Sequence, residues 1–194
     1  MKELSLHLLD LAENSVSAQA RTITIAVCED MAADRLQVSV ADDGKGMPPE
    51  VAARVVDPFF TSRTTRNVGL GIPLLKEAAE ACRGSLELVS QPGVGTTVTA
   101  IFQHSHIDRM PLGNLPDTLL GLLVAPPEIH WVFHYYLQQA GSAEPYCFAF
   151  DDQPVKEILD GLPLSEPSVL AFLRETLTSG IIVAEHWKLL GMLK

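Results

Sequence analysis

The order of hydrophobic periodicities in the first half of the chain most constrains its fold. Apolar residues recur at helical spacing or alternate as in strands, and glycine, proline and acidic residues separate these segments. This order predicts an α/β sandwich, in which helices cover one face of a mixed sheet. The predicted elements are a helix over 3–19, strands over 22–27 and 36–40, a short helix from Pro48, a helix over 71–82, and strands over 85–90 and 96–102.

The second half of the chain has a pattern of its own. Periodicity lapses over residues 105–116, where proline, glycine and asparagine predict a linker. We therefore expect a first domain of residues 1–104 and a small α+β unit of residues 117–194 that docks on it. The elements predicted in this unit are a helix over 117–123, a hairpin of strands 129–138 and 145–150, and helices over 154–160 and 167–179.

Aromatic residues occupy both faces of the predicted strand 129–138. Trp131, Phe133 and Tyr135 would lie on one face of this strand, while His134 and Tyr136 would lie on the other. Two interpretations stay open: a core strand whose outer face is covered, or a surface that docks a partner protein.

Charge and composition narrow the classes of partner. The chain has 14 lysine and arginine residues against 24 aspartate and glutamate residues, which gives a net charge of −10. Such an excess of negative charge disfavours both nucleic acid and anionic lipid as partners. We expect no apolar run of the ~20 residues that cross a bilayer and no secretory signal, which predicts a cytoplasmic protein with no membrane partner. The three cysteines share no metal-binding spacing.

Three polar segments of the first half carry the candidate chemistry. Asp10 and Asn14 lie one helical turn apart, and their oxygen atoms suit a hard cation such as Mg²⁺. The loop Asp42–Met47 follows a buried strand, and its glycines allow a flat ligand to approach the backbone. The turn Gly69–Gly71 opens a helix whose free amides favour an anion. Each segment by itself is also typical of an ordinary turn or helix surface.

The order of these segments resembles the motifs of the GHKL ATPases, the family of gyrase B, the large heat-shock chaperone, histidine kinases and the MutL mismatch-repair ATPase. The resemblance covers residues 3–103. It implies a Bergerat-type mixed sheet and a histidine-kinase-like ATP-binding domain. The matching segments are Leu9–Ser15 for the N box, Asp42–Met47 for the G1 box, Asp57–Thr61 for the F box, Gly69–Gly71 for the G2 box, and Gly84–Thr97 for the end of a histidine-kinase catalytic domain.

The resemblance implies that the chain binds ATP and Mg²⁺. Asn14 would be the protein ligand of the Mg²⁺ ion that bridges the phosphates. Asp42 would accept a hydrogen bond from the adenine amine, with a water molecule and Thr97 completing the contact. Asp10 stands where ATPase members carry the glutamate that activates water, so the resemblance makes it the candidate catalytic residue.

The resemblance also assigns contacts to the loops around the nucleotide. The base would lie against Gly44 and Gly46, with Met47 packed on it. The phosphates would meet backbone amides and positive charges, namely the amides of Gly69, Leu70 and Gly71 and the guanidinium groups of Arg63 or Arg66.

Two functions are compatible with these residues. No histidine carries the phosphoacceptor motif of a histidine kinase, and only nine residues precede Asp10. We therefore expect transfer of the γ-phosphate to a separate protein partner in signalling or regulation. The alternative is a non-catalytic or slowly hydrolysing module that senses ATP and switches a partner interaction. The sequence leaves open the acceptor, the oligomeric state and the role of residues 105–194.

Overall fold

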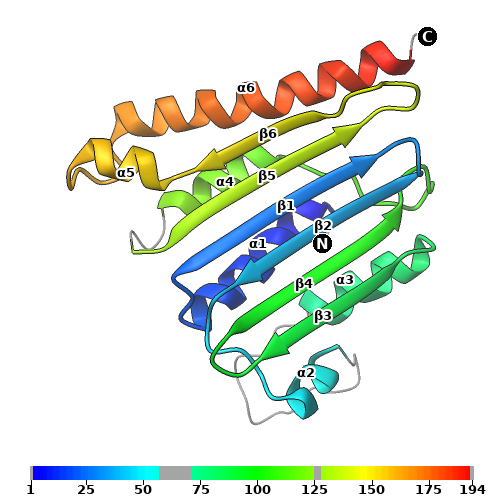
Figure 1. Cartoon of the computed structure of the whole chain (residues 1–194), viewed down its shortest axis with the longest axis horizontal. Coiled ribbons are helices and arrows are strands. Elements are labelled where there is room, and N and C mark those ends of the chain that lie inside the picture. The colour runs from blue at the N-terminus through cyan, green and yellow to red at the C-terminus, as the bar shows by residue number, and fades with distance from the viewer. Residues whose placement is uncertain (1, 57–70, 125–127, 193–194) are drawn as a thin grey trace.

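Six strands form one mixed sheet in the computed structural model of this protein (Figure 1). The strands are β1 (Thr22–Asp30), β2 (Arg35–Asp42), β3 (Ser85–Gln91), β4 (Gly95–Gln103), β5 (His130–Gln138) and β6 (Tyr146–Asp151). Their order across the sheet is β3-β4-β2-β1-β5-β6, and each neighbouring pair is antiparallel except β1 with β5. The structure describes residues 2–56, 71–124 and 128–192, and of residues 185–192 it describes only the backbone.

The helices gather on one side of this sheet. They are α1 (Leu4–Ser17), α2 (Pro49–Val55), α3 (Gly71–Ala81), α4 (Leu115–Val124), α5 (Gln153–Leu159) and α6 (Pro167–Met192). Helices α1, α3 and α4 lie behind the sheet in Figure 1, α6 packs against α4 and β6, and α2 lies beside β3. The predicted α/β sandwich with helices on one face is therefore confirmed.

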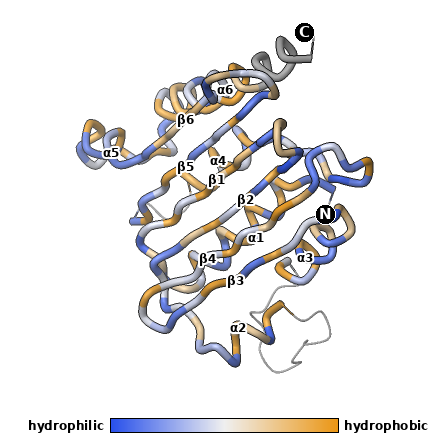
Figure 2. Tube along the Cα trace, turned by 45° about the vertical axis from the view of Figure 1, so that its right-hand side comes forward, coloured by the Kyte–Doolittle hydropathy of each residue, from blue (hydrophilic) through white to orange (hydrophobic). Residues whose placement is uncertain are grey.

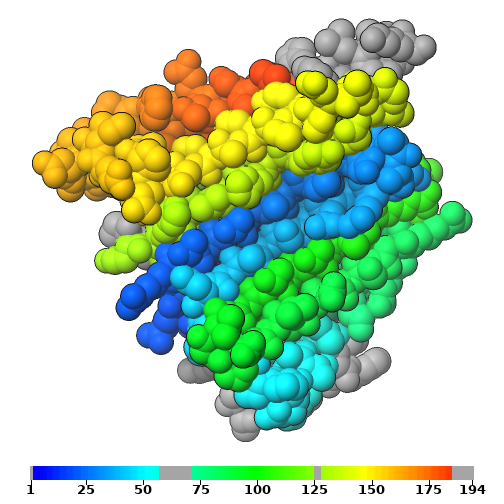
Figure 3. Space-filling model, viewed as in Figure 1, coloured from blue at the N-terminus to red at the C-terminus, as the bar shows by residue number. Residues whose placement is uncertain are grey.

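The sheet has one buried face and one open face because its strands alternate. In β1, Ile23, Ile25 and Val27 are buried, whereas the residues between them are partly exposed. The colour of the strands in Figure 2 changes between hydrophobic and hydrophilic along their length. In Figure 3, no helix of the described residues covers the sheet face turned to the viewer. The buried face packs on α1, whose Leu4 and Leu8 are almost wholly inaccessible to solvent.

The aromatic strand β5 joins the two halves of the chain in one sheet. Its Phe133 and Tyr135 lie in the core, while His134 on the open face is exposed. The Tyr135 hydroxyl donates to the buried Glu29 carboxylate on β1, and His104 Nε2 lies 2.8 Å from the other Glu29 oxygen. The inner face of β5 is thus a core surface, and the described residues form no helical cover on its outer face (Figure 3).

Residues 117–194 were expected to form a small unit that docks on the first domain. In the structure, β5 and β6 extend the sheet of that domain. β5 pairs in parallel with β1 along the full length of both strands. The predicted linker is also tied down, because the Leu4 and Ser5 amides donate to the carbonyls of Pro111 and Leu112 at 3.0 and 2.8 Å. Local periodicity shows that a strand forms but not which distant strand it pairs with, and this explains the difference.

The last helix is longer than its sequence pattern predicted, since α6 runs to Met192 rather than to residue 179. Gly180 continues the helix and packs closely on Phe148, where an added Cβ would lie 2.4 Å from the ring. Among the described residues, α6 is the helix that is long and apolar enough to cross a membrane by length and composition, a feature not expected from the sequence. Its Leu173 and Leu177 are fully buried within the chain.

Candidate nucleotide site

Helix α1 presents two polar side chains beside the start of α3. Leu4, Leu8 and Leu11 bury one face of α1 in the core, and this fixes the helix rotation. Asp10 and Asn14 are then one turn apart and both half-buried. The sequence prediction that these two side chains share one face of a helix agrees with this arrangement.

The Asp10 carboxylate lies directly against the first residue of α3. A Cβ added to Gly71 would lie 1.6 Å from Asp10 Oδ2, so only glycine permits this approach. Asp10 Oδ2 is buried and has no hydrogen-bond partner among the described residues. A buried carboxylate oxygen without a partner is costly, and such groups concentrate at sites that bind or react.

Asp42 is held in one orientation by two hydrogen bonds. The Ser15 hydroxyl on α1 donates to Asp42 Oδ2 at 2.7 Å, and the Gly44 amide donates to Asp42 Oδ1 at 2.9 Å. Ser15 is buried, whereas Asp42 remains half-buried at the end of β2. The carboxylate is therefore oriented in advance and retains accepting capacity for a ligand amine.

The neighbouring carboxylate, Asp43, binds the backbone at the start of β1. Its Oδ1 accepts hydrogen bonds from the Arg21 and Thr22 amides at 2.6 and 2.9 Å, which fixes the start of β1. Burial acts to raise the pKa of the Asp43 carboxyl, but the amides of Thr22 and Arg21 together outweigh it and lower the pKa. Of this acidic pair, Asp43 therefore binds the backbone at the start of β1, whereas Asp42 is oriented by Ser15 and Gly44.

Two glycine loops meet at the end of β2, and only glycines allow the contact. Gly46 has φ +62°, and a Cβ there would lie 2.0 Å from the Gln91 carbonyl oxygen. Gly95 has φ +135°, and its Cβ would lie 1.9 Å from the Asp42 carbonyl oxygen. The Ser90 hydroxyl accepts from the Met47 amide at 2.8 Å and so holds the two loops together.

Thr97 does not reach this site, which corrects the contact expected from the sequence. In the β2–β4 register Thr97 faces Ala41 and Thr96 faces Asp42. Directly opposed residues point to the same side of a sheet, so Thr97 lies on the open face and is exposed. Thr96 lies on the helix side, with its hydroxyl 2.8 Å from the Ser90 hydroxyl.

Part of the predicted phosphate site lies outside the described residues. This applies to Arg63, Arg66, Gly69 and Leu70, whose expected roles stay predictions. Gly71 is the one member of the predicted glycine turn that the structure places.

Ser15 and Ser90 support the candidate site through hydrogen bonds to Asp42 and Met47, and the sequence interpretation missed both. Ser15 follows Asn14 on α1, and Ser90 takes an inward position of β3 after the apolar Leu86 and Leu88. The sequence could have indicated Ser90, because a hydroxyl at an inward-facing strand position needs a buried hydrogen-bond partner. Ser15 gave no comparable signal, because its partner Asp42 lies 27 residues away.

The first half of the chain matches the family model described as histidine kinase-, DNA gyrase B-, and HSP90-like ATPase, over residues 2–106. This match covers more than half of the 194 residues, and the chain belongs to that family. It contains an ATP-binding module of the kind found in histidine kinases.

Curated relatives are sensor kinases and a related bacterial protein. The chain is 43% identical over 93 residues to the sensor protein kinase FleS of Pseudomonas aeruginosa, a match that covers 48% of this chain and 23% of FleS. It is 36% identical over 111 residues to the non-motile and phage-resistance protein of Caulobacter vibrioides, covering 53% of this chain and 13% of that protein. The chain therefore spans less than a quarter of the length of either relative.

A solved structure shows a fold likeness that reaches beyond the family match. The N-terminal domain of a DNA repair protein aligns with a TM-score of 0.51 at 14% identity, and covers 77% of this chain and 53% of that domain's chain. At this identity the likeness concerns the fold alone. Its coverage exceeds the part matched by the family model, so it includes residues after 106.

Proposed function

We propose that this chain binds ATP together with Mg²⁺ and directs the γ-phosphate to a separate protein partner. The observation that carries the proposal is the half-buried Asp10 carboxylate, whose buried Oδ2 lies against Gly71 at the start of α3 and has no hydrogen-bond partner among the described residues. Asn14 adds a second oxygen one turn away. These oxygens suit a hard cation, and the start of a helix suits a phosphate anion.

The adenine end of the proposed site is Asp42. The bonds from Ser15 and Gly44 hold its carboxylate in place, so its spare lone pairs face the helix side of the sheet, where a base amine would lie. Gly46 and Gly95 carry no side chain, which lets the two loops approach each other beside Asp42. Met47, whose backbone is fixed by Ser90, would pack on the base.

The phosphate end rests on α1 and on the start of α3. Asn14 would hold Mg²⁺, and the bound ion would neutralise phosphate charge. Asp10 would accept a hydrogen bond or a proton from the attacking hydroxyl or water. Gly71 would keep the backbone of α3 within reach of Asp10, because it carries no side chain between them.

The family membership supports the proposal that the γ-phosphate passes from ATP to a protein partner. The matched relatives include sensor kinases, and phosphoryl transfer requires mainly positioning and charge neutralisation from the enzyme. A partner protein would supply the acceptor side chain. A cytoplasmic location is part of the same proposal, since a signalling kinase module consumes ATP where ATP is available.

Incubation with γ-labelled ATP, Mg²⁺ and candidate acceptor proteins tests the proposal. We expect label on an acceptor with the wild-type chain, and at least tenfold less label with Asp10→Asn, while ATP binding persists. Glu13→Gln, an exposed substitution on the same helix, is the matched control and should leave transfer unchanged. Unimpaired binding with no transfer or hydrolysis by the wild-type chain would instead support a nucleotide-sensing module.

A further inference from the structure

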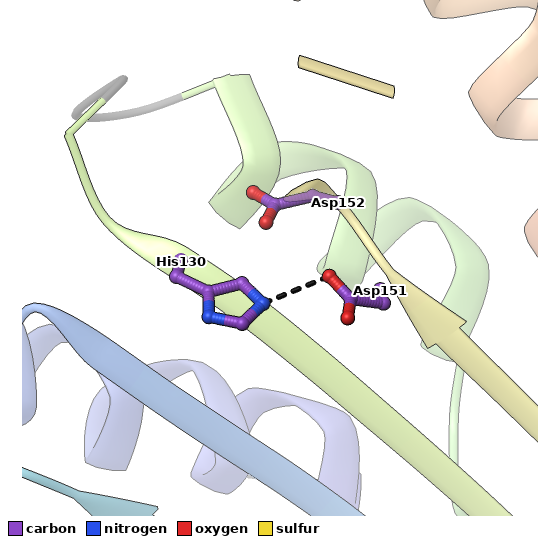
Figure 4. A group of neighbouring side chains, drawn as sticks. All are labelled: His130, Asp151 and Asp152. Atoms are coloured by element: carbon purple, nitrogen blue, oxygen red, sulfur yellow. Dashed lines mark hydrogen bonds and ion pairs between the residues drawn. The ribbon is translucent and has the colours of Figure 1, made fainter. Parts of the chain in front are cut away.

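A second group of potential ligands lies toward the β6 edge of the sheet, and β1 separates it from Asp42. His130 begins β5, and Asp151 and Asp152 lie at the end of β6 (Figure 4). One atom from each of these three side chains falls within 4.8 Å of the others. Figure 4 shows the His130 ring turned toward Asp151, with 2.8 Å between His130 Nε2 and Asp151 Oδ1.

The backbone fixes two of these side chains. The Asp152 amide donates to the Trp131 carbonyl at 3.2 Å, and the Trp131 amide donates back to Asp152 Oδ1 at 3.0 Å. Asp151 Oδ1 accepts from the Gln153 amide at 2.9 Å. The group is therefore built into the end of the β5–β6 ladder and does not depend on long mobile side chains.

Asp152 is the unusual member, because its side chain is completely buried. Its Oδ2 accepts no hydrogen bond among the described residues. The Lys156 ammonium lies 2.8 Å from this oxygen, close enough for an ion pair but outside hydrogen-bond geometry. The same ammonium also donates to the Ile129 carbonyl. A buried carboxylate needs compensation, and here the Trp131 amide and one cation, which is shared with a carbonyl, supply it.

We propose that His130, Asp151 and Asp152 form a binding site for a divalent transition-metal ion such as Zn²⁺. One imidazole nitrogen with two carboxylate oxygens is a ligand set for borderline metal ions rather than for Mg²⁺, which prefers oxygen alone. Zn²⁺ ligands lie at about 2.0–2.2 Å from the ion, so the three ligand atoms, which lie within 4.8 Å of one another, would have to move closer together to hold one ion. His130 and Asp151 are partly exposed, which leaves room for water ligands.

Lys156 gives this site a built-in competitor. Its ammonium neutralises Asp152 when no metal is bound, which keeps the buried charge paired. A divalent ion next to Asp152 would repel the ammonium. Lys156 is partly exposed and can turn into solvent, at a cost in metal affinity. Removing this charge should therefore strengthen metal binding, whereas a purely structural ion pair predicts no such gain.

Titration of the full chain with Zn²⁺ in a calorimeter tests the site, with Mg²⁺ as a second probe. We expect one Zn²⁺ per chain, at least tenfold weaker binding in His130→Asn, and at least threefold tighter binding in Lys156→Met. His134→Asn is the matched control, because His134 lies on the same strand and outside the group. Cys147→Ser, at an exposed thiol, controls for binding to cysteine.

Circular dichroism shows whether each variant remains folded, and His130→Asn keeps the test valid if changes at the buried Asp152 prevent folding. Equal Zn²⁺ affinity in the wild type and His130→Asn overturns the proposal. Loss of binding in Cys147→Ser or His134→Asn overturns it too, as does unchanged or weaker binding in Lys156→Met. None of these outcomes depends on ATP, so the nucleotide site is tested separately.

Discussion

Ser15 orients Asp42 in the candidate nucleotide site through a single hydrogen bond. Its hydroxyl donates to Asp42 Oδ2 from a buried position on α1. Ser15→Ala should weaken ATP binding at least tenfold, since a hydrogen bond to a charged group contributes about 1.5–3 kcal/mol and about 1.4 kcal/mol is a factor of ten. Equilibrium titration with a fluorescent ATP analogue measures the change. Ser17→Ala, an exposed serine on the same helix, should bind as the wild type does, and equal affinities in both variants would contradict the assigned role.

The lowered pKa of Asp43 predicts how the stability of the fold changes with pH. Its folded-state pKa is lowered, because the amides of Thr22 and Arg21 outweigh burial. A carboxyl of this kind contributes stability above its unfolded pKa of about 3.9, and that stability is lost as pH falls through the lower folded pKa. Asp43→Asn should therefore lower the urea midpoint at pH 6 and have a smaller effect near pH 3. Asp160→Asn, at an exposed site, should show no such pH-dependent difference.

Single residues also show what a sequence can indicate about a site. Asp10, Asn14 and Asp42 could be proposed because a helical spacing or a strand end places them, and both are local properties. Ser15 was missed because its partner is remote in the chain. Thr97 was chosen in place of Thr96 because a one-residue change of register moves a side chain to the other face, and register is set by pairing with β2.

At the scale of the elements, the contact between the two glycine loops is the feature that we expect to be most sensitive to substitution. Gly46→Ala should reduce stability by about 1–2 kcal/mol from its left-handed φ alone, and by more because the Cβ would meet the Gln91 carbonyl. ATP affinity should fall as well, since the loop carries Asp42 at one end. Gly121→Ala on α4 is the control, where open space predicts stabilisation of about 0.5–1 kcal/mol. Chemical denaturation of both variants measures these changes, and a stable Gly46→Ala would contradict the account.

The helices and strands of the first half were predictable because each carries its own periodicity. The predicted strands 22–27 and 36–40 correspond to β1 and β2, although both are longer in the structure. The extra length comes from polar residues such as Glu29 and Arg35, which alternate in the ladder without an apolar signal. The end of α6 was missed for a related reason, because Gly180 reads as a break while in the structure it packs on Phe148.

At the scale of the whole molecule, the parallel pairing of β1 with β5 makes the two halves interdependent. A fragment of residues 117–194 should be largely unfolded, because Phe133 and Tyr135 would lose the core they pack into. Nuclear magnetic resonance shift dispersion of the isolated fragment measures this. Mixing it with a fragment of residues 1–106 should restore dispersion. A well-dispersed spectrum of residues 117–194 alone would instead support the two-unit division expected from the sequence.

The central claim is that Asp42, rather than its neighbour Asp43, recognises the base of ATP. Calorimetric titration with ATP and Mg²⁺ of the wild type, Asp42→Asn and Asp43→Asn tests it most directly. Both substitutions remove one charge from the same loop, but Asp43 Oδ1 serves the backbone of β1. We expect Asp42→Asn to bind ATP at least tenfold more weakly and Asp43→Asn to bind it as the wild type does. Wild-type affinity in Asp42→Asn would contradict the account.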